Sequence, residues 1–258
     1  MRSRSVRAAA GLLLLSAIAC SGLPLGRHYE YEEQLYLGAD GSATVIIASS
    51  IAALVALRGL PLNPSPTART DRGEIRRALE AGGCTVDNVG QGWRRSGRRF
   101  VQFRISTDNV RTLRSCGVLS WSSYALGPAE DAADRLRYLQ IVGPPTPGDP
   151  GQVNWDGSEL VAFKLHLPSR IHHHNVRRLE DNSTGDVERG NILTWEQRFA
   201  DRRGGQPITM DVTMDATSIL YTTLWLFAGA FAAALLVLAT IIWLVVRKGR
   251  KGNIKLKT

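Results

Sequence analysis

The sequence predicts an α+β fold: a mostly antiparallel β ectodomain with two or three helices, followed by one C-terminal transmembrane helix. Three observations lead to this prediction. Stretches in which apolar and polar residues alternate are typical of half-buried strands. Short segments that carry helix-capping residues lie between them. No charged residue occurs between Asp215 and Arg247, an uncharged run longer than a globular helix usually contains.

Residues 1–20 are predicted to be a secretory signal peptide. Three arginines precede an uncharged run that ends in small residues. Cys20 directly after Ala19 has the position of the lipid-modified cysteine of a bacterial lipoprotein, whereas Ala17-Ile18-Ala19 fits an ordinary cleavage site, and a retained helix is the third alternative. A secretory signal places the following residues outside the cytoplasm.

The two strands of the first hairpin are predicted within residues 27–48, around the turn Ala39-Asp40-Gly41, because Asp-Gly between β-rich runs favours a hairpin. The apolar run that follows, residues 46–57, is too short to span a bilayer. It is either a buried helix of the domain or an exposed apolar lip that contacts lipid or a ligand.

A capped amphipathic helix is predicted next, with Asp71 as its N-cap and Gly82 as its stop. Beyond it, residues 84–88 and 100–107 are predicted to be strands and residues 108–116 a short helix. A loop rich in Pro and Gly, residues 143–152, is a position at which the domain of residues 21–215 could divide into two. Three more strands are predicted after it: 159–168, 191–200 and 207–215.

Residues 219–246 are predicted to cross a membrane, since a span needs only about 20 apolar residues. Tyr221, Trp225 and Trp243 lie near its ends, as interfacial aromatic residues do. The tail, residues 247–258, carries six basic residues and no acid, so the positive-inside rule places it in the cytoplasm. We therefore expect a protein of the bacterial cytoplasmic membrane, with its main domain outside and its C-terminus inside.

The net charge of +9 reflects this topology. Nine of the 32 basic residues lie in the leader and the tail, so residues 21–215 carry 23 basic and 23 acidic side chains. A nucleic-acid-binding domain carries its positive excess on the folded part. We therefore expect the membrane as a partner, and no nucleic acid.

The sequence resembles the LppM-like family of bacterial envelope lipoproteins. The resemblance rests on the cysteine after the leader, the terminal span and three short motifs: the "ADGSATV" hairpin, Phe163-x-Leu165-x-Leu167-Pro168 followed by Asn175, and Gly190-Asn191-x-x-Thr194-Trp195. Membership of this family implies an α+β ectodomain on a bacterial envelope, with no established enzymatic activity.

The histidine-rich segment "SRIHHHN" is a weak candidate for a metal site. In an extended chain only His172 and His174 share a face, and His166 joins them only across the turn at Pro168. No cysteine or carboxylate nearby completes a ligand set. A solvated polar segment is the preferred interpretation, and a metal-dependent or hydrolytic ectodomain that uses these three histidines is the alternative.

Four arginines, Arg94, Arg95, Arg98 and Arg99, surround a predicted Ser-Gly turn. Guanidinium groups bind phosphate bidentately, so this tip is a candidate contact for anionic head groups or an acidic polymer. The alternative is a soluble hairpin tip protected by its charge.

Cys84 and Cys116 are either a disulfide in an oxidising compartment or two small buried thiols.

No catalytic motif occurs in the sequence, and no enzyme activity or cofactor is expected. The preferred function is a non-catalytic module, anchored in the membrane, that binds a lipid, a glycolipid or an envelope protein. A further alternative is an accessory subunit of a membrane complex, held through the small residues of the span: Gly229, Ala230, Ala233 and Ala234.

Overall fold

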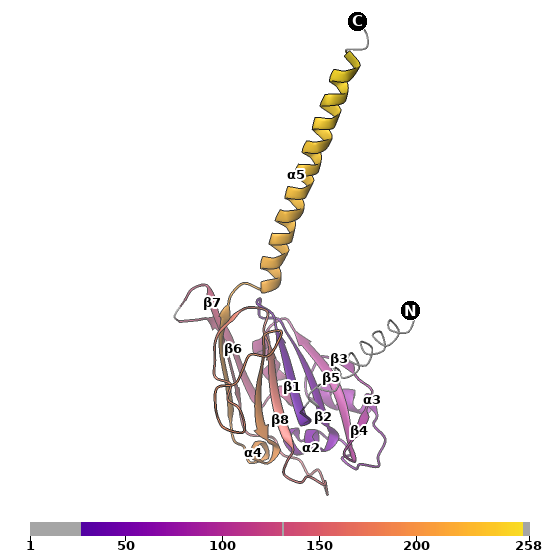
Figure 1. Cartoon of the computed structure of the whole chain (residues 1–258). Coiled ribbons are helices and arrows are strands. Elements are labelled where there is room, and N and C mark those ends of the chain that lie inside the picture. Colours follow the sequence, from indigo (N-terminus) through magenta and orange to yellow (C-terminus); the bar gives the residue numbers. More distant parts are fainter. Residues whose placement is uncertain (1–26, 131, 255–258) are drawn as a thin grey trace, which may run out of the picture.

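Two β-sheets face each other over one hydrophobic core, and a long helix, α5 (Ile219–Ile254), projects from one end of the sandwich (Figure 1). The architecture comes from a computed structural model that describes residues 27–130 and 132–254. The predicted leader and Cys20 lie outside the described residues. The predicted α+β class with mostly antiparallel strands is confirmed.

The large sheet has the strand order β10-β8-β1-β2-β5-β3, and β4 pairs with the free end of β5. All of its pairings are antiparallel except that of β1 with β8. The seven strands are β1 (Tyr29–Leu37), β2 (Ala43–Ser50), β3 (Val86–Val89), β4 (Trp93–Arg95), β5 (Arg98–Thr107), β8 (Leu160–His166) and β10 (Ile192–Arg198).

The small sheet is antiparallel throughout, with the order β6-β7-β11-β9. Its strands are β6 (Ser122–Pro128), β7 (Arg135–Val142), β9 (Ile171–His174) and β11 (Ile208–Asp215). The sequence predicts β11 but not the other three. In β6 and β7 the inward positions include Ser122 and Gln140, both buried, and these polar residues interrupt the apolar alternation that marks a strand.

The loop at residues 143–152 does not divide the domain, contrary to the possibility raised by its composition. The strands β1 and β7 precede the loop, and β8 and β11 follow it. β8 pairs with β1, and β11 pairs with β7. Each sheet therefore contains strands that precede the loop in the sequence and strands that follow it, and both parts of the chain contribute to one core.

The apolar run after the first hairpin forms a buried helix, α2 (Ile51–Arg58), and the lip alternative is wrong. All eight of its residues are buried, and Leu54 has no exposed surface. The Ser50 hydroxyl caps it by accepting from the Ala53 amide at 3.0 Å, and Gly59 ends it with a left-handed φ of 59°. Because α2 belongs to the core, this run offers no apolar surface to a lipid.

The other helical segments are short. Asp71 caps α3 (Arg72–Ala81) as predicted, and Ile75 and Leu79 are its buried residues. The helix predicted at residues 108–116 is a 3₁₀ helix, η1 (Val110–Ser115), and a second 3₁₀ turn, η2 (Gly117–Leu119), follows it. A helical turn, α4 (Phe199–Arg203), precedes the Gly-Gly that leads into β11.

A group of polar side chains lies inside the core, between the two sheets. The carboxylate of Glu33 accepts hydrogen bonds from the Tyr31 hydroxyl at 3.0 Å and from Nε2 of Gln140 at 3.2 Å. Burial raises the pKa of Glu33 above its ordinary value, although these donors oppose the rise. The Tyr138 hydroxyl in turn donates to Oε1 of Gln140 at 2.7 Å, so the group links both sheets.

Two arginines accompany this polar group and flank Trp121. The guanidinium carbons of Arg58 and Arg202 lie 4.5 Å and 5.2 Å from the centre of the indole ring. Arg58 donates to the carbonyls of Val118 and Gly117 at 2.8 and 2.7 Å. Arg202 has no exposed surface, although the sequence places it in a charged turn.

α5 is fixed to the domain at its first residue. The Ile219 amide donates to the Pro168 carbonyl at 3.0 Å, and the amides of Ala216 and Asp215 donate to the carbonyls of Asp134 and Arg170 at 2.9 and 3.0 Å. We call this end of the sandwich the proximal end and the opposite end the distal end. The distal end holds α2, α4 and β4 (Figure 1).

The helix α5 is a candidate membrane span. Within Ile219–Lys248, an 18-residue window has a mean hydropathy of 2.6, and none of that window is buried against the rest of the protein. The helix continues to Ile254, beyond the predicted end of the span at residue 246. Lys and Arg are good helix formers, and positive charge is favourable near a helix C-terminus, so the first basic residues of the tail extend the helix.

Candidate functional site

The predicted arginine hairpin is present, but its four arginines do not form one patch. β4 and β5 turn at Ser96 and Gly97, whose φ angles of 49° and 74° are both left-handed. The register pairs Arg94 with Arg99 and the other two arginines with each other. Because side chains alternate along a strand, the two pairs point to opposite faces of the hairpin.

Arg95 and Arg98 are engaged within the protein. Nε of Arg98 lies 3.1 Å from Oε2 of Glu30, and its Nη1 lies 3.2 Å from Oε1 of Glu159. Nη2 of Arg95 donates to the Tyr29 carbonyl. These two guanidinium groups are therefore not available to a head group, contrary to the sequence-based prediction.

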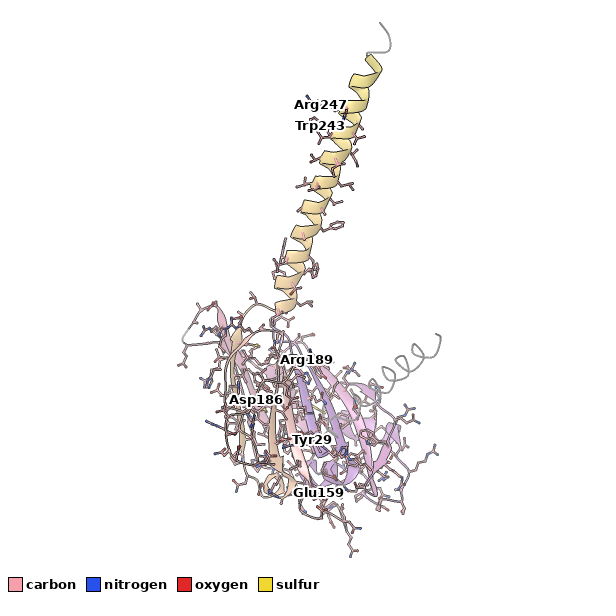
Figure 2. The ribbon with its side chains drawn as sticks, viewed as in Figure 1. Tyr29, Glu159, Asp186, Arg189, Trp243 and Arg247 are labelled. Atoms are coloured by element: carbon pink, nitrogen blue, oxygen red, sulfur yellow. A yellow bond between two sulfur atoms is a disulfide. The ribbon has the colours of Figure 1, made fainter. Side chains whose placement is uncertain are left out.

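The hairpin lies at the distal end of the domain. Figure 2 shows Glu159, the partner of Arg98, at the end of the sandwich farthest from α5. Arg99 and Thr107 are at opposite ends of β5, a separation of about 26 Å at the rise of an extended strand. A membrane that contains α5 is thus out of reach of this hairpin.

Arg99 holds the preceding loop in place. It is 6% exposed, and it donates to the carbonyls of Ser65 and Arg69 at 2.8 and 3.1 Å and to that of Asn63. Burial lowers the pKa of Arg99, and the neighbouring charge of Arg94 lowers it further. The guanidinium group thereby fixes residues 63–70 against the hairpin.

A groove of about 650 Å³ lies between this loop, the start of α3 and the hairpin. Arg69, Arg72 and Arg94 are exposed along it, and none of the three forms an ion pair or donates a side-chain hydrogen bond within the described residues. No carboxylate lines the groove. Its lining residues are Ala68, Arg69, Thr70, Arg72, Gln91, Gly92, Trp93, Arg94 and Arg99.

Local packing sets the walls of the groove. Residue 92 is glycine because a Cβ there would lie 2.8 Å from Cγ2 of Thr70, so the loop and the β4 segment approach closely. Asp71, the acidic residue next to the groove, accepts from the Gly73 and Glu74 amides at 2.8 and 3.3 Å, and these bonds lower its pKa. Its carboxylate is therefore held at the start of α3.

The arrangement can bind an anion. Three unpaired guanidinium groups line the groove, and each presents a planar fork that matches phosphate or carboxylate oxygens, while the guanidinium of Arg99 is already engaged by backbone carbonyls. The sequence identifies Arg94 and Arg99 but misses Arg69 and Arg72, which lie more than 20 positions earlier. No local pattern signals that a loop and a helix start will fold beside this hairpin.

The three candidate metal ligands are not brought together. His166 lies on β8 in the large sheet, where its ring stacks on Tyr36 at 3.9 Å, while His172 and His174 lie on β9 in the small sheet. Among residues 27–130 and 132–254, no group of three or more His, Cys, Asp or Glu side chains is arranged to hold a metal ion. The geometry offers no support for a metal site at these histidines.

A bulge also changes the faces of β9. The register shifts where Met214 pairs with Ile171 and Thr213 pairs with His173. As a result His172 and His173 line the same surface groove, whereas His174 pairs with the buried Val212. The prediction that His172 and His174 share a face is wrong, because it assumes an uninterrupted strand.

Cys84 and Cys116 are joined by a disulfide, with their Cα atoms 4.3 Å apart. It links the chain after α3 to the end of η1. The opposite end of α3, its first turn, lines the groove.

The comparisons with known proteins give one distant likeness. No family model matches the chain, and no curated protein matches it. The folded domain of the LppM protein of Mycobacterium tuberculosis, determined by NMR, is similar with a TM-score of 0.39 and 12% sequence identity, over 77% of this chain and 98% of that chain. The resemblance to the LppM-like family therefore stays a prediction.

Proposed function

We propose that this protein is a non-catalytic binding module anchored in the bacterial cytoplasmic membrane by α5. The ectodomain binds a component of the envelope outside the cytoplasm, and the arginine groove is its contact surface. One observation carries the proposal: β4, which supplies Arg94 to the groove, lies at the distal end, while the apolar helix leaves from the proximal end (Figure 1).

This geometry narrows the classes of ligand expected from the sequence. A lipid taken up by an apolar lip is excluded because α2 is buried. A ligand that approaches from the outside, either a glycolipid or protein displayed away from the bilayer or a polymer of the envelope, can reach the groove. The basic residues after Val246 favour a cytoplasmic C-terminus, which points the groove outward.

Photo-crosslinking in intact membranes tests the proposal. A photoreactive amino acid in place of Gln91, an exposed residue of the groove, should yield a reproducible adduct with an envelope component. The same substitution at Arg114, exposed on η1 away from the groove, is the matched control. Equal labelling at both positions, or none at Gln91, would contradict the proposal.

A further inference from the structure

The groove carries a concentrated positive charge in a domain that is otherwise balanced. Residues 21–215 have equal numbers of basic and acidic side chains, yet the groove is lined by four arginines and no acid. Some arginines elsewhere are paired, as Arg137 is with Asp211 at 2.6 Å and Arg178 with Asp186, whereas no other part of the described surface groups three unpaired arginines in one groove with no acid in its lining. The unpaired charge at the groove is therefore free to bind an anionic ligand from outside the chain.

The shape of the groove favours an extended ligand. A second recess adjoins the groove at Arg69, Thr70 and Arg72 and reaches Gly73 at the first turn of α3, and the carboxylate of Asp71, held by the amides of that turn, is also in its lining. A single phosphate or carboxylate can engage only one or two guanidinium forks at a time. Arginines spread along a surface of this extent match a chain that repeats its negative charge.

The uncharged lining favours a carbohydrate. Trp93 is 38% exposed on strand β4, packed at 5.6 Å against the buried ring of Phe100, so its position is fixed. An indole with one apolar side in solvent is a surface on which the C–H face of a sugar ring packs. The hydroxyl of Thr70 and the amide of Gln91 add hydrogen-bonding groups for sugar hydroxyls.

We propose that the groove binds an anionic polysaccharide, with Arg69, Arg72 and Arg94 on its charged groups and Trp93 on its sugar rings. This inference rests on the proposed function and names the ligand class of the same site. The membrane that holds α5 is not the ligand, since β4, which carries Trp93 and Arg94 of the groove, lies at the distal end (Figure 1).

Binding titrations with the full-length protein in zwitterionic lipid nanodiscs test the inference. The probe is a polygalacturonate oligosaccharide of defined length, and the matched ligand is its methyl ester, which keeps the sugar and loses the charge. The wild type should bind the first and not the second, with an affinity that falls as salt is added.

The matched variants separate the groove from general charge. Replacing Arg69, Arg72 and Arg94 together by Gln should weaken binding by about three- to a hundredfold at low salt, as expected for three exposed ionic contacts. Replacing Arg104 and Arg114, which are exposed outside the groove, should change it less than about twofold. Trp93→Leu should weaken polygalacturonate binding severalfold and leave binding of poly-glutamate unchanged, in protein whose melting temperature is retained.

Three results would overturn the inference: no binding of polygalacturonate, equal losses in the groove and control variants, or poly-glutamate bound as tightly with no effect of Trp93→Leu. Groove-dependent binding of anionic lipid vesicles in preference to polygalacturonate would assign a lipid instead and also overturn it. An adduct at Gln91 together with any of these results leaves the binding function standing and rejects only the ligand class.

Discussion

The Tyr31 hydroxyl donates to Oε2 of Glu33 at 3.0 Å in the space between the two sheets, where both side chains are buried. Both residues lie on the same face of β1, two positions apart. A carboxyl group in this position affects the stability of the whole domain, because it can change its charge only at the cost of burying that charge.

Glu33 should make stability fall as the pH rises. Its pKa is raised by burial, so above the ordinary glutamate pKa of 4.5 the folded state holds more protons than the unfolded state. The contribution to stability is full below that value and is lost as the pH rises through the higher pKa of the folded state. Glu33→Gln should flatten this slope in thermal unfolding followed from pH 4 upward, whereas Glu80→Gln, an exposed change on α3, should not.

Leu54 should behave as a core residue. It has no exposed surface in α2, so Leu54→Ala should lower the free energy of unfolding by about 2–5 kcal/mol. Denaturant unfolding measures the change, with Val187→Ala at a 42% exposed site as the control. A Leu54→Ala protein as stable as the control variant would restore the lip interpretation.

Arg99 should act by positioning the loop of residues 63–70. Lysine keeps the charge but cannot reach three carbonyls, so Arg99→Lys should lower the free energy of unfolding by about 1–3 kcal/mol. Trypsin should then cleave faster after Arg69 in the native protein. Arg104→Lys, on the same strand but exposed, gives the comparison rate; equal rates would show that Arg99 does not hold the loop.

The disulfide should contribute to stability without forming part of the groove. A crosslink between positions 32 residues apart stabilises a protein by about 3–4 kcal/mol through the entropy of the unfolded chain. Replacing Cys84 and Cys116 by Ser should lower the unfolding midpoint by a corresponding amount. Polygalacturonate affinity, measured well below that midpoint, should change little, and a large loss would place the disulfide among the residues that shape the site.

The orientation of the chain can be read by chemical labelling. A cysteine introduced at Ser158, exposed at the distal end, should react with a membrane-impermeant maleimide in cells whose outer layers have been made permeable. A cysteine at Thr258 should react only after the cytoplasmic membrane is disrupted. The parent protein reports the background from Cys20, and the reverse labelling pattern would show that the groove faces the cytoplasm.

Elements with a strong local pattern are those that the sequence predicts well. The hairpin at Asp40-Gly41, the helix capped by Asp71 and the strand β11 each carry their signal within a few residues, because capping, turn geometry and alternation are local effects. β7 escapes prediction because Gln140 faces the core, and the polar group that satisfies it comes from both sheets.

The site is harder to predict because its chemistry depends on distant contacts. Arg98 and Arg94 look alike in the sequence, yet one is paired with Glu30 and Glu159 while the other stays unpaired. Arg202 is similarly indistinguishable from a surface arginine until the fold encloses it. Only the tertiary structure decides which charges remain available.

No flexible linker separates the domain from α5, because the junction between Asp215 and Ile219 is short and hydrogen-bonded. The amides of Asp215, Ala216 and Ile219 all donate to carbonyls of the domain. Because of these bonds, a rotation of α5 about its own axis rotates the sandwich with it. A neighbouring helix that fixes the rotation of α5 in the bilayer therefore also fixes the direction, in the plane of the membrane, that the arginine groove faces. In a row of such helices related by translation, all the grooves would face in the same direction.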